Sequence, residues 1–270
     1  MFRNGALCHD LRKQPTAPDH PLDRYAPVIV LVPNAGLTCG YVAVTMKVMK
    51  YAASESALHI ELSIDEGHAL KSAAVRLRTE FADAFDVETV ERMVCSSYEK
   101  LAAHATVRDF LPLLAERFAR QQLHAIAKIN GKSHDYQLVV LFLCNHNAGR
   151  SQMAMGFFKQ LAGGGAVVWS GGSEPKGEIN PAAITAMAER GIDISGEYSK
   201  PWTGEIIQAA DVIVSMGCGD TGPTLPGRRY EDWALDDPAG KDVASIRPIR
   251  DEIERRVRRL LDDLRIPYRS

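Results

Sequence analysis

The stretch Leu138–Met155, LVVLFLCNHNAGRSQMAM, contains the pattern that decides the fold. It opens with six apolar residues rich in Val and Leu, which predict a short strand buried on both faces, as in parallel sheets. The apolar run ends on Cys144, continues through the seven-residue bend Asn145–Ser151 and then takes up a helical pattern. The stretch therefore predicts a strand, a loop and a helix, with a cysteine at the strand end.

The loop carries the spacing Cys-x5-Arg-Ser, formed by Cys144, Arg150 and Ser151. A loop that wraps from a strand into a helix start points backbone N–H groups inward, which makes a nest for a tetrahedral oxyanion. Arg150 can clamp two oxygens of that anion, and the positive surroundings favour a thiolate at Cys144. Ser151 can hydrogen-bond the thiolate, Asn147 can hold the shape of the loop, and Gly149 tolerates dihedrals that most residues avoid. We expect the oxyanion to be bound by Asn145, His146, Asn147, Ala148, Gly149, Arg150 and Ser151.

Composition narrows the class of protein. The 270 residues are 46% hydrophobic and 24% charged, with a net charge of −2, so no global basic field would attract nucleic acid or an anionic membrane. No stretch has the length and apolarity of a spanning helix or a secretory leader, so we expect a cytoplasmic protein. Five widely spaced cysteines do not resemble a disulfide framework. Scattered His residues give no metal-ligand spacing, and we expect no metal site.

The chain divides into three predicted parts. Residues 1–66 form an extension with no assigned role, in which Val28–Val32 is a candidate strand and Tyr41–Ala53 reads equally as helix or strand. Residues 67–133 are predicted to form a bundle of three helices and a polar linker. Residues 134–270 are predicted to form the catalytic domain.

The helical pattern between Gly67 and Lys128 breaks into three amphipathic segments. Asp86 is placed to cap the second segment, and the third is expected to run from about Val107 to Lys128 with Pro112 in its first turn. Cys95 is interpreted as a small buried residue of the second helix. The apolar and aromatic residues recur at core spacing, so we assign them to packing between the helices.

Strands and helices alternate after residue 136. Short strands are predicted at Val167–Ser170 and Asp211–Met216, a helix at Pro181–Arg190, and a last helix starting near Pro248. This alternation is typical of a doubly wound parallel sheet, here of four strands, whose functional site lies at the carboxyl ends of the strands. Cys144 lies at such an end.

A second cysteine and two carboxylates complete the candidate site. Cys218 follows the third strand in the glycine-rich SMGCGD, and its thiol could attack Cys144 to form a disulfide; alternatively, it is a small residue packed in a tight turn. Asp237, directly before Pro238, is the candidate general acid that protonates a leaving oxygen. Asp236 is its rival, and either carboxylate could merely cap the turn.

Several motifs resemble a known family. The segments CNHNAGRSQMA, SGGSEPKGEINPAAITAMAERGIDIS, VSMGCGDTGP and YEDWALDDPAG resemble the low-molecular-weight tyrosine phosphatases, and more narrowly their arsenate reductase branch. The likeness covers Tyr136–Ile266, and the preceding helical segment resembles the three-helix domain of such reductases in some actinobacteria. The resemblance implies Cys144 as nucleophile, Arg150 as oxyanion clamp, Asp237 as acid, Asn147 and Ser151 as supports, and Cys218 as the second redox cysteine.

One departure from this resemblance affects the reductant. Relatives that use an intramolecular relay carry a further cysteine soon after the Cys218 position, whereas here no cysteine follows it. Two routes stay open. A small thiol, mycothiol or glutathione, could attack the arsenic adduct on Cys144, with mycoredoxin or glutaredoxin resolving the mixed disulfide. Alternatively, a disulfide between Cys144 and Cys218 could be reduced directly by a redoxin such as thioredoxin. The actinobacterial likeness favours mycothiol.

Three functions compete. The first is thiol-dependent reduction of arsenate to arsenite, which detoxifies arsenic. The second is a phosphatase acting on phosphotyrosine or small phosphomonoesters, because arsenate and phosphate are nearly isosteric. The third is an oxyanion-binding regulatory module whose bundle recruits a partner. Cys144 could also be only a buried structural cysteine, but the strand and helix around it favour a nucleophile, and Arg150 with Asp237 argues against an inactive module.

Overall fold

The computed structural model describes residues 25–33, 41–49, 62–105, 109–133, 137–217 and 225–268. The first two ranges form a hairpin that belongs to a compact unit of its own, residues 9–61. Strand β1 (Tyr25–Pro33) pairs antiparallel with β2 (Tyr41–Met49), so that Tyr25 lies opposite Met49. The candidate strand at 28–32 is therefore present, and Tyr41–Met49, the described part of the ambiguous segment, is a strand.

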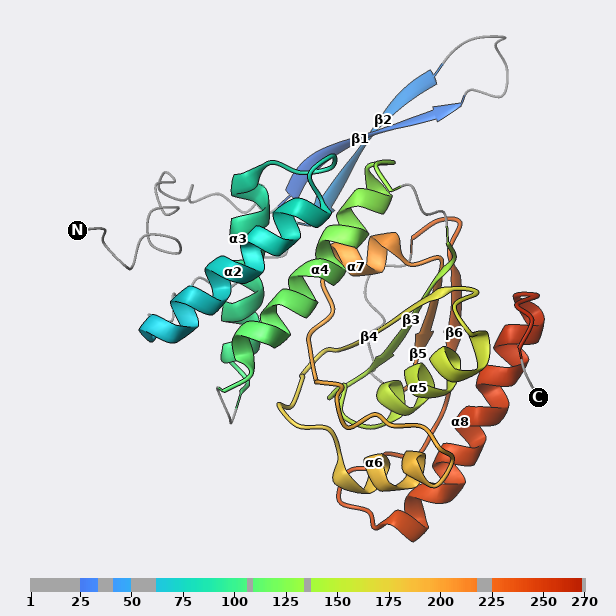
Figure 1. Cartoon of the computed structure of the whole chain (residues 1–270). Coiled ribbons are helices and arrows are strands. Elements are labelled where there is room, and N and C mark those ends of the chain that lie inside the picture. The colour runs from blue at the N-terminus through green and yellow to red at the C-terminus, as the bar shows by residue number, and fades with distance from the viewer. Residues whose placement is uncertain are drawn as a thin grey trace. The chain divides into compact units, whose positions relative to one another are not determined.

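Three helices follow, as the sequence predicts (Figure 1): α2 (Ile64–Glu80), α3 (Val87–Ala102) and α4 (Leu111–Ile129). α2 starts with a capping box, in which the Ser63 hydroxyl accepts from the Glu66 amide and the Glu66 carboxylate accepts from the Ser63 amide. This reciprocal pair satisfies two amides that the helix itself cannot.

The other two helices begin differently. Asp86 caps α3 as expected, since its carboxylate accepts from the Thr89 amide at 2.7 Å. α4 begins at Leu111, later than the expected Val107, with Pro112 in its first turn. Cys95 is buried, in agreement with the sequence. The bundle interior is formed by apolar side chains of all three helices, among them Leu70, Leu77, Val90, Val94, Tyr98, Leu101, Phe118 and Leu123.

The four-stranded parallel sheet is present. Its order is β4 (Val167–Gly172), β3 (Val139–Cys144), β5 (Val212–Ser215) and β6 (Arg229–Asp232). Every residue of β3 is buried, because it is a central strand with a neighbour on each side. The edge strand β6 has the polar sequence RYED. It contains no apolar run from which a strand could be predicted.

The helices α5 (Arg150–Ala162), α6 (Pro181–Ala188) and α8 (Val243–Asp263) pack together around the main hydrophobic core. The sheet contributes Val140, Phe142, Val212 and Val214 to this core. The helix α8 begins at Val243, earlier than the predicted start near Pro248, because the Asp242 carboxylate caps it by accepting from the Ser245 amide at 2.9 Å. A short helix, α7 (Gly204–Ala209), precedes β5.

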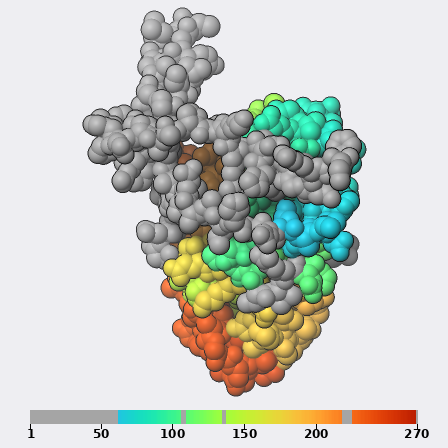
Figure 2. All heavy atoms as spheres, turned by 90° about the vertical axis from the view of Figure 1, so that its left-hand side faces the viewer, coloured from blue at the N-terminus to red at the C-terminus, as the bar shows by residue number. Residues whose placement is uncertain are grey.

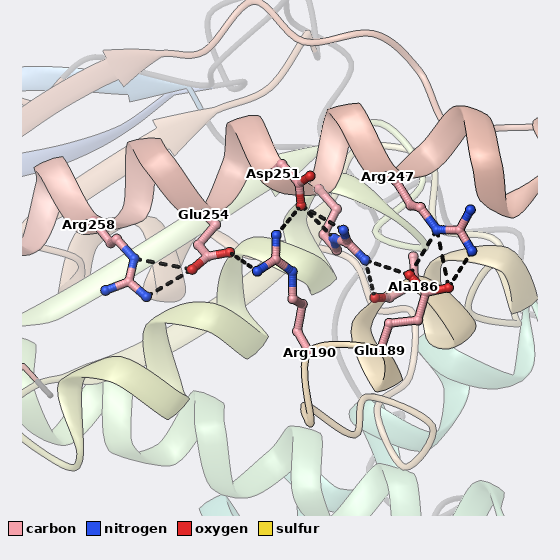
Figure 3. A network of polar contacts seen from close by, with 8 residues as sticks. Ala186, Glu189, Arg190, Arg247, Asp251, Glu254 and Arg258 are labelled. Atoms are coloured by element: carbon pink, nitrogen blue, oxygen red, sulfur yellow. Dashed lines mark hydrogen bonds and ion pairs between the residues drawn. The ribbon is translucent and has the colours of Figure 1, made fainter. Parts of the chain in front are cut away.

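A network of ion pairs fastens the end of α6 to α8 (Figure 3). Glu189 accepts from Arg247 and Arg250, and Arg190 bonds Asp251 at 2.8 Å. The hydrogen bonds from Arg247, followed by those from Arg250, lower the pKa of Glu189 to about 2. The network thus fixes the helix that follows the loop after β4.

The bundle and the sheet domain belong to one compact unit, in which α4 packs against α7. Lys128 near the end of α4 forms an ion pair with Asp211, next to β5. Arg117 in the middle of α4 donates to the Gly196 carbonyl at 2.8 Å. Figure 2 shows the cyan and green surface of the bundle adjoining the yellow and orange surface of residues that follow β3. Within the described residues, no helix is long and apolar enough to cross a membrane.

Candidate active site

The loop of residues 144–151, here called the anion loop, lies at the carboxyl end of the central strand β3 and leads into α5. Its carbonyl oxygens point away from the site: those of Asn145, His146 and Ala148 accept from backbone amides of residues 174, 176 and 180 at 2.8 to 3.2 Å. Because the N–H of a trans peptide points opposite to its C=O, the amides of residues 146, 147 and 149 point to the other side of the loop. Gly149 at the N-cap has no side chain to cap α5, so the first-turn amides are available to an anion.

Asn147 fixes the shape of this loop from inside. Its backbone is left-handed, with φ of 48°, and the residue is fully buried. The Asn147 Oδ1 accepts from the Lys200 amide at 3.0 Å and from the Gln152 Nε2 at 3.1 Å, while its Nδ2 donates to Ser151 Oγ at 2.8 Å. These bonds hold Asn147 in a left-handed conformation, which asparagine adopts more readily than most residues.

Cys144 is 3% exposed, and its Sγ lies 3.0 Å from Ser151 Oγ. Because Asn147 already donates to that hydroxyl oxygen, the hydroxyl proton is free to point at the sulfur. The Ser151 hydroxyl can therefore form a hydrogen bond with the Cys144 sulfur. The geometry therefore places Asn147 and Ser151 where the sequence predicted supports for the nucleophile.

Arg150 and Asp237 face each other across the cavity mouth. The Arg150 guanidinium is buried, with Nη2 at 3.5 Å from the Asp237 Oδ2 and Nη1 at 3.4 Å from the Leu235 carbonyl. The Asp237 side chain is 49% exposed, whereas Asp236 is 80% exposed and pairs with Lys241. Geometry thus favours Asp237 over its rival. A cavity of about 200 Å³ is lined by both Cys144 and Asp237.

Three residues that the sequence analysis missed support the site. The backbone N–H of Asn180 donates to the Ala148 carbonyl at 2.8 Å, and its side-chain Nδ2 donates to the Pro238 carbonyl at 3.0 Å. Asn180 therefore joins the anion loop to the loop of the candidate acid. Gln152 donates to Asn147 as described. Lys200 is buried, and its Nζ donates to Ser170 Oγ at 3.2 Å.

Burial lowers the pKa of Lys200 to about 8, partly opposed by the nearby Glu197 carboxylate. Its ammonium lies 4.5 Å from the centre of the Tyr198 ring, a cation–π arrangement. The local sequence pattern does not predict these roles for Lys200, Gln152 and Asn180. Each forms its hydrogen bond with a segment remote in sequence or with a backbone atom. The predicted second thiol, Cys218, lies outside the described residues, so its position relative to Cys144 stays a prediction.

Comparisons with known proteins give the family. Residues 139–267 match the model of the low molecular weight phosphotyrosine protein phosphatases, and residues 70–127 match the protein-tyrosine-phosphatase-like N-terminal domain. Arsenate reductase 1 of Staphylococcus epidermidis is 44% identical over 119 residues, which are 43% of this chain and 89% of that protein. The chain belongs to the low-molecular-weight phosphotyrosine phosphatase family.

Other relatives point to the same branch of this family. The glutaredoxin arsenate reductase of Synechocystis is 40% identical over 125 residues, 45% of this chain and 95% of that protein. Among solved structures, the thioredoxin-dependent arsenate reductase of Corynebacterium glutamicum matches with a TM-score of 0.66 and 38% identity, covering 73% of this chain and 97% of that one. This last likeness is long enough to include more than the phosphatase-like domain.

Proposed function

We propose that this phosphatase-family protein reduces arsenate to arsenite, with Cys144 as the nucleophile. The observation that carries the proposal is the meeting of a buried cysteine, an arginine and a carboxylate at one small cavity. The arsenate reductases among its relatives support the choice of substrate. A cavity of about 200 Å³ suits an inorganic oxyanion better than a large organic substrate.

Binding comes first. The inward amides of the anion loop and the start of α5 would hold the arsenate oxygens, and the Arg150 guanidinium would bind two of them. Buried donors that are already in place need no reorganisation when charge develops on the oxyanion. Residues 145–151 therefore serve as the binding site of the proposal.

The first chemical step forms a bond between Cys144 Sγ and arsenic while one arsenic–oxygen bond breaks. The departing oxygen needs a proton to leave as water. Glu178 and Asp237 both line the cavity, and we assign this role to Asp237 because it lies beside the Arg150 guanidinium. The Ser151 hydroxyl steadies the thiolate before attack. The product is a covalent adduct in which arsenic is still in oxidation state +5.

The second step is the reduction. A second thiolate attacks the Cys144 sulfur, a disulfide forms, and the electron pair of the sulfur–arsenic bond passes to arsenic, which leaves as As(III). The two thiols lose the two electrons that arsenic gains. The attacking thiol is either Cys218 or a small thiol such as mycothiol or glutathione, and an external redoxin then restores the reduced enzyme.

We assign the last step to a redoxin because residues 219–224, GDTGPT, contain no cysteine at the place where relatives with an intramolecular relay carry a further one. Thioredoxin would act on a disulfide between Cys144 and Cys218, whereas mycoredoxin or glutaredoxin would act on a mixed disulfide with the small thiol. The relatives named above include one that is thioredoxin-dependent and one named for glutaredoxin, and both support an external redoxin.

The test is arsenate-dependent turnover of the wild-type protein and of Cys218→Ser, each with thioredoxin plus its reductase and, separately, with mycothiol plus mycoredoxin. Hydrolysis of para-nitrophenyl phosphate is measured alongside, since it needs Cys144 but no second thiol. We expect arsenate turnover by the wild type. If Cys218→Ser loses arsenate turnover but keeps phosphate-ester hydrolysis, the second thiol is Cys218. If Cys218→Ser keeps full arsenate turnover with mycothiol, the second thiol is the small thiol. Hydrolysis without arsenate turnover in either system would overturn the proposal.

A further inference from the structure

The segment of residues 196–200 lies between the helical bundle and the anion loop. On the bundle side it is contacted by Arg117 of α4, which donates to the Gly196 carbonyl at 2.8 Å and reaches the Glu197 carboxylate at 3.4 Å. The same guanidinium lies 4.9 Å from the centre of the Tyr198 ring, close enough for a cation–π contact. One side chain of the bundle thus contacts three consecutive residues of this segment.

On its other side the segment is bonded to the anion loop. Ser199 Oγ donates to the His146 carbonyl at 2.7 Å, and the Lys200 amide donates to Asn147 Oδ1 at 3.0 Å. The Tyr198 carbonyl accepts from Gln152 Nε2 at 3.0 Å. Three consecutive residues of the segment therefore bond residues in or next to the anion loop.

The bonds continue to the nucleophile. Asn147 donates to Ser151, and Ser151 lies 3.0 Å from the Cys144 sulfur. A continuous series of hydrogen bonds and short covalent links therefore runs from Arg117 on the bundle to Cys144. Asn147 in the middle has a left-handed backbone, with φ of 48°, a conformation that asparagine tolerates better than most residues.

We propose that Arg117 is a positioning residue, through which the helical bundle holds the anion loop in its anion-binding shape. The bundle then has a role in the activity without touching the substrate. Arg117 acts through residues 196–200, and Lys159 of α5 supports the same segment by bonding Glu197 at 2.6 Å. The proposal rests on the proposed function for its turnover measurement, but its binding measurement needs only an anion at the loop.

A second ionic link between the bundle and the sheet domain provides a matched control. Lys128 on the same helix pairs with Asp211. The exposed fractions of the two basic side chains are similar, 23% for Lys128 and 37% for Arg117. Asp211 bonds the Val139 amide at 2.9 Å, at the beginning of β3 and thus at the end of the sheet away from Cys144. Loss of either link weakens the attachment of the bundle, but only loss of Arg117 should disturb the anion loop.

The experiment measures binding of inorganic phosphate by isothermal titration calorimetry to the reduced full chain, in Arg117→Met, Lys128→Met and Arg117→Lys. Arg150→Met, which removes the clamp, should abolish the signal and so show that the heat reports the anion loop. We expect Arg117→Met to weaken phosphate binding about fivefold, as suits a partly exposed charge-assisted bond. The KM for arsenate should rise by a similar factor, with kcat changed less.

Lys128→Met should bind phosphate within about twofold of the wild type. Arg117→Lys should recover only part of the loss, because an ammonium can still donate to the Gly196 carbonyl but lacks the planar fork that also reaches Glu197 and lies over Tyr198. Should Arg117→Met fail to fold by circular dichroism, Ser199→Ala tests the next bond of the series with the same expected loss. Unchanged phosphate binding in Arg117→Met, or an equal loss in Lys128→Met, would overturn the proposal, whatever the arsenate measurements show.

Discussion

Replacement of Gly172 by Ala tests whether the shape of the anion loop controls activity. Gly172 ends β4 directly beside Cys144 in the sheet register. A Cβ at this position would lie 2.7 Å from the Asn145 carbonyl oxygen and 2.9 Å from the Asn147 amide nitrogen. The Gly172 backbone is bonded to the Lys200 carbonyl at 3.0 Å, and its φ lies outside the left-handed region, so crowding rather than dihedral strain is the perturbation.

The size of the effect follows from these distances. The Asn145 oxygen must retreat by about 0.7 Å before the contact reaches the 3.4 Å at which it becomes ordinary. Crowding of this kind costs about 1–3 kcal/mol of stability. Displacement of catalytic groups by roughly 1 Å costs about 100-fold in rate. We therefore expect Gly172→Ala to lose about 10- to 100-fold in kcat/KM for arsenate and to unfold at a lower temperature.

The assay is steady-state arsenate turnover with thermal unfolding measured on the same samples. Gly204→Ala is the control, because a Cβ there meets nothing within 4 Å; it should keep both the kcat/KM and the unfolding temperature of the wild type. If Gly172→Ala unfolds at a lower temperature but turns over arsenate as fast as the wild type, the geometry of the loop does not control the reaction and the reasoning is refuted.

Three further outcomes are expected. Asp237→Asn should lower kcat about 100-fold or more, since a general acid contributes a factor of about 10²–10⁴ to the rate. The control Asp236→Asn should keep a kcat near that of the wild type. Equal losses of kcat in the two variants, measured by steady-state kinetics, would contradict the choice of acid. Glu189 contributes stability that is complete above pH 4.5, its ordinary pKa, and is lost as pH falls toward about 2, so the difference in melting temperature between wild type and Glu189→Gln should vanish over that range. The pKa of Lys200, about 8, lies below its ordinary 10.5, so between these pH values the unfolded chain binds more protons than the folded one and the free energy of unfolding rises with pH. Urea titrations over this pH range should show the wild type gaining about 3 kcal/mol over Lys200→Met. A difference that does not change with pH would contradict the lowering of this pKa by burial.

The anion loop was predictable because its parts lie within eight consecutive residues. The apolar run of β3 leads directly to Cys144, and Arg150 follows in the same short loop. A loop that follows a buried parallel strand lies at the carboxyl end of the sheet, where functional sites of such sheets are found. The supports of this loop were not predictable in the same way. Asn180 and Lys200 reach it across the fold through hydrogen bonds with other segments, and such bonds leave no periodic pattern.

Some boundaries differed for identifiable reasons. Asp242 supplies a cap that starts α8 before Pro248, and a proline near a helix start suggested the later beginning. The strand β6 has no apolar run because it pairs with only one neighbour and its side chains are half-buried or exposed. The choice between Asp236 and Asp237 depended on side-chain direction, which two adjacent identical residues cannot reveal. The three-part domain division and the role of Cys218 stay predictions.

The most direct test of the central claim is the formation of arsenite from arsenate by wild-type protein and by Cys144→Ser, measured with both the thioredoxin and the mycothiol systems present. The account predicts sustained arsenite production by the wild type and none above background in Cys144→Ser, with both proteins folded by circular dichroism. Equal arsenite production by the two proteins, or none by the wild type, would contradict the assignment of Cys144 as the thiol that attacks arsenate.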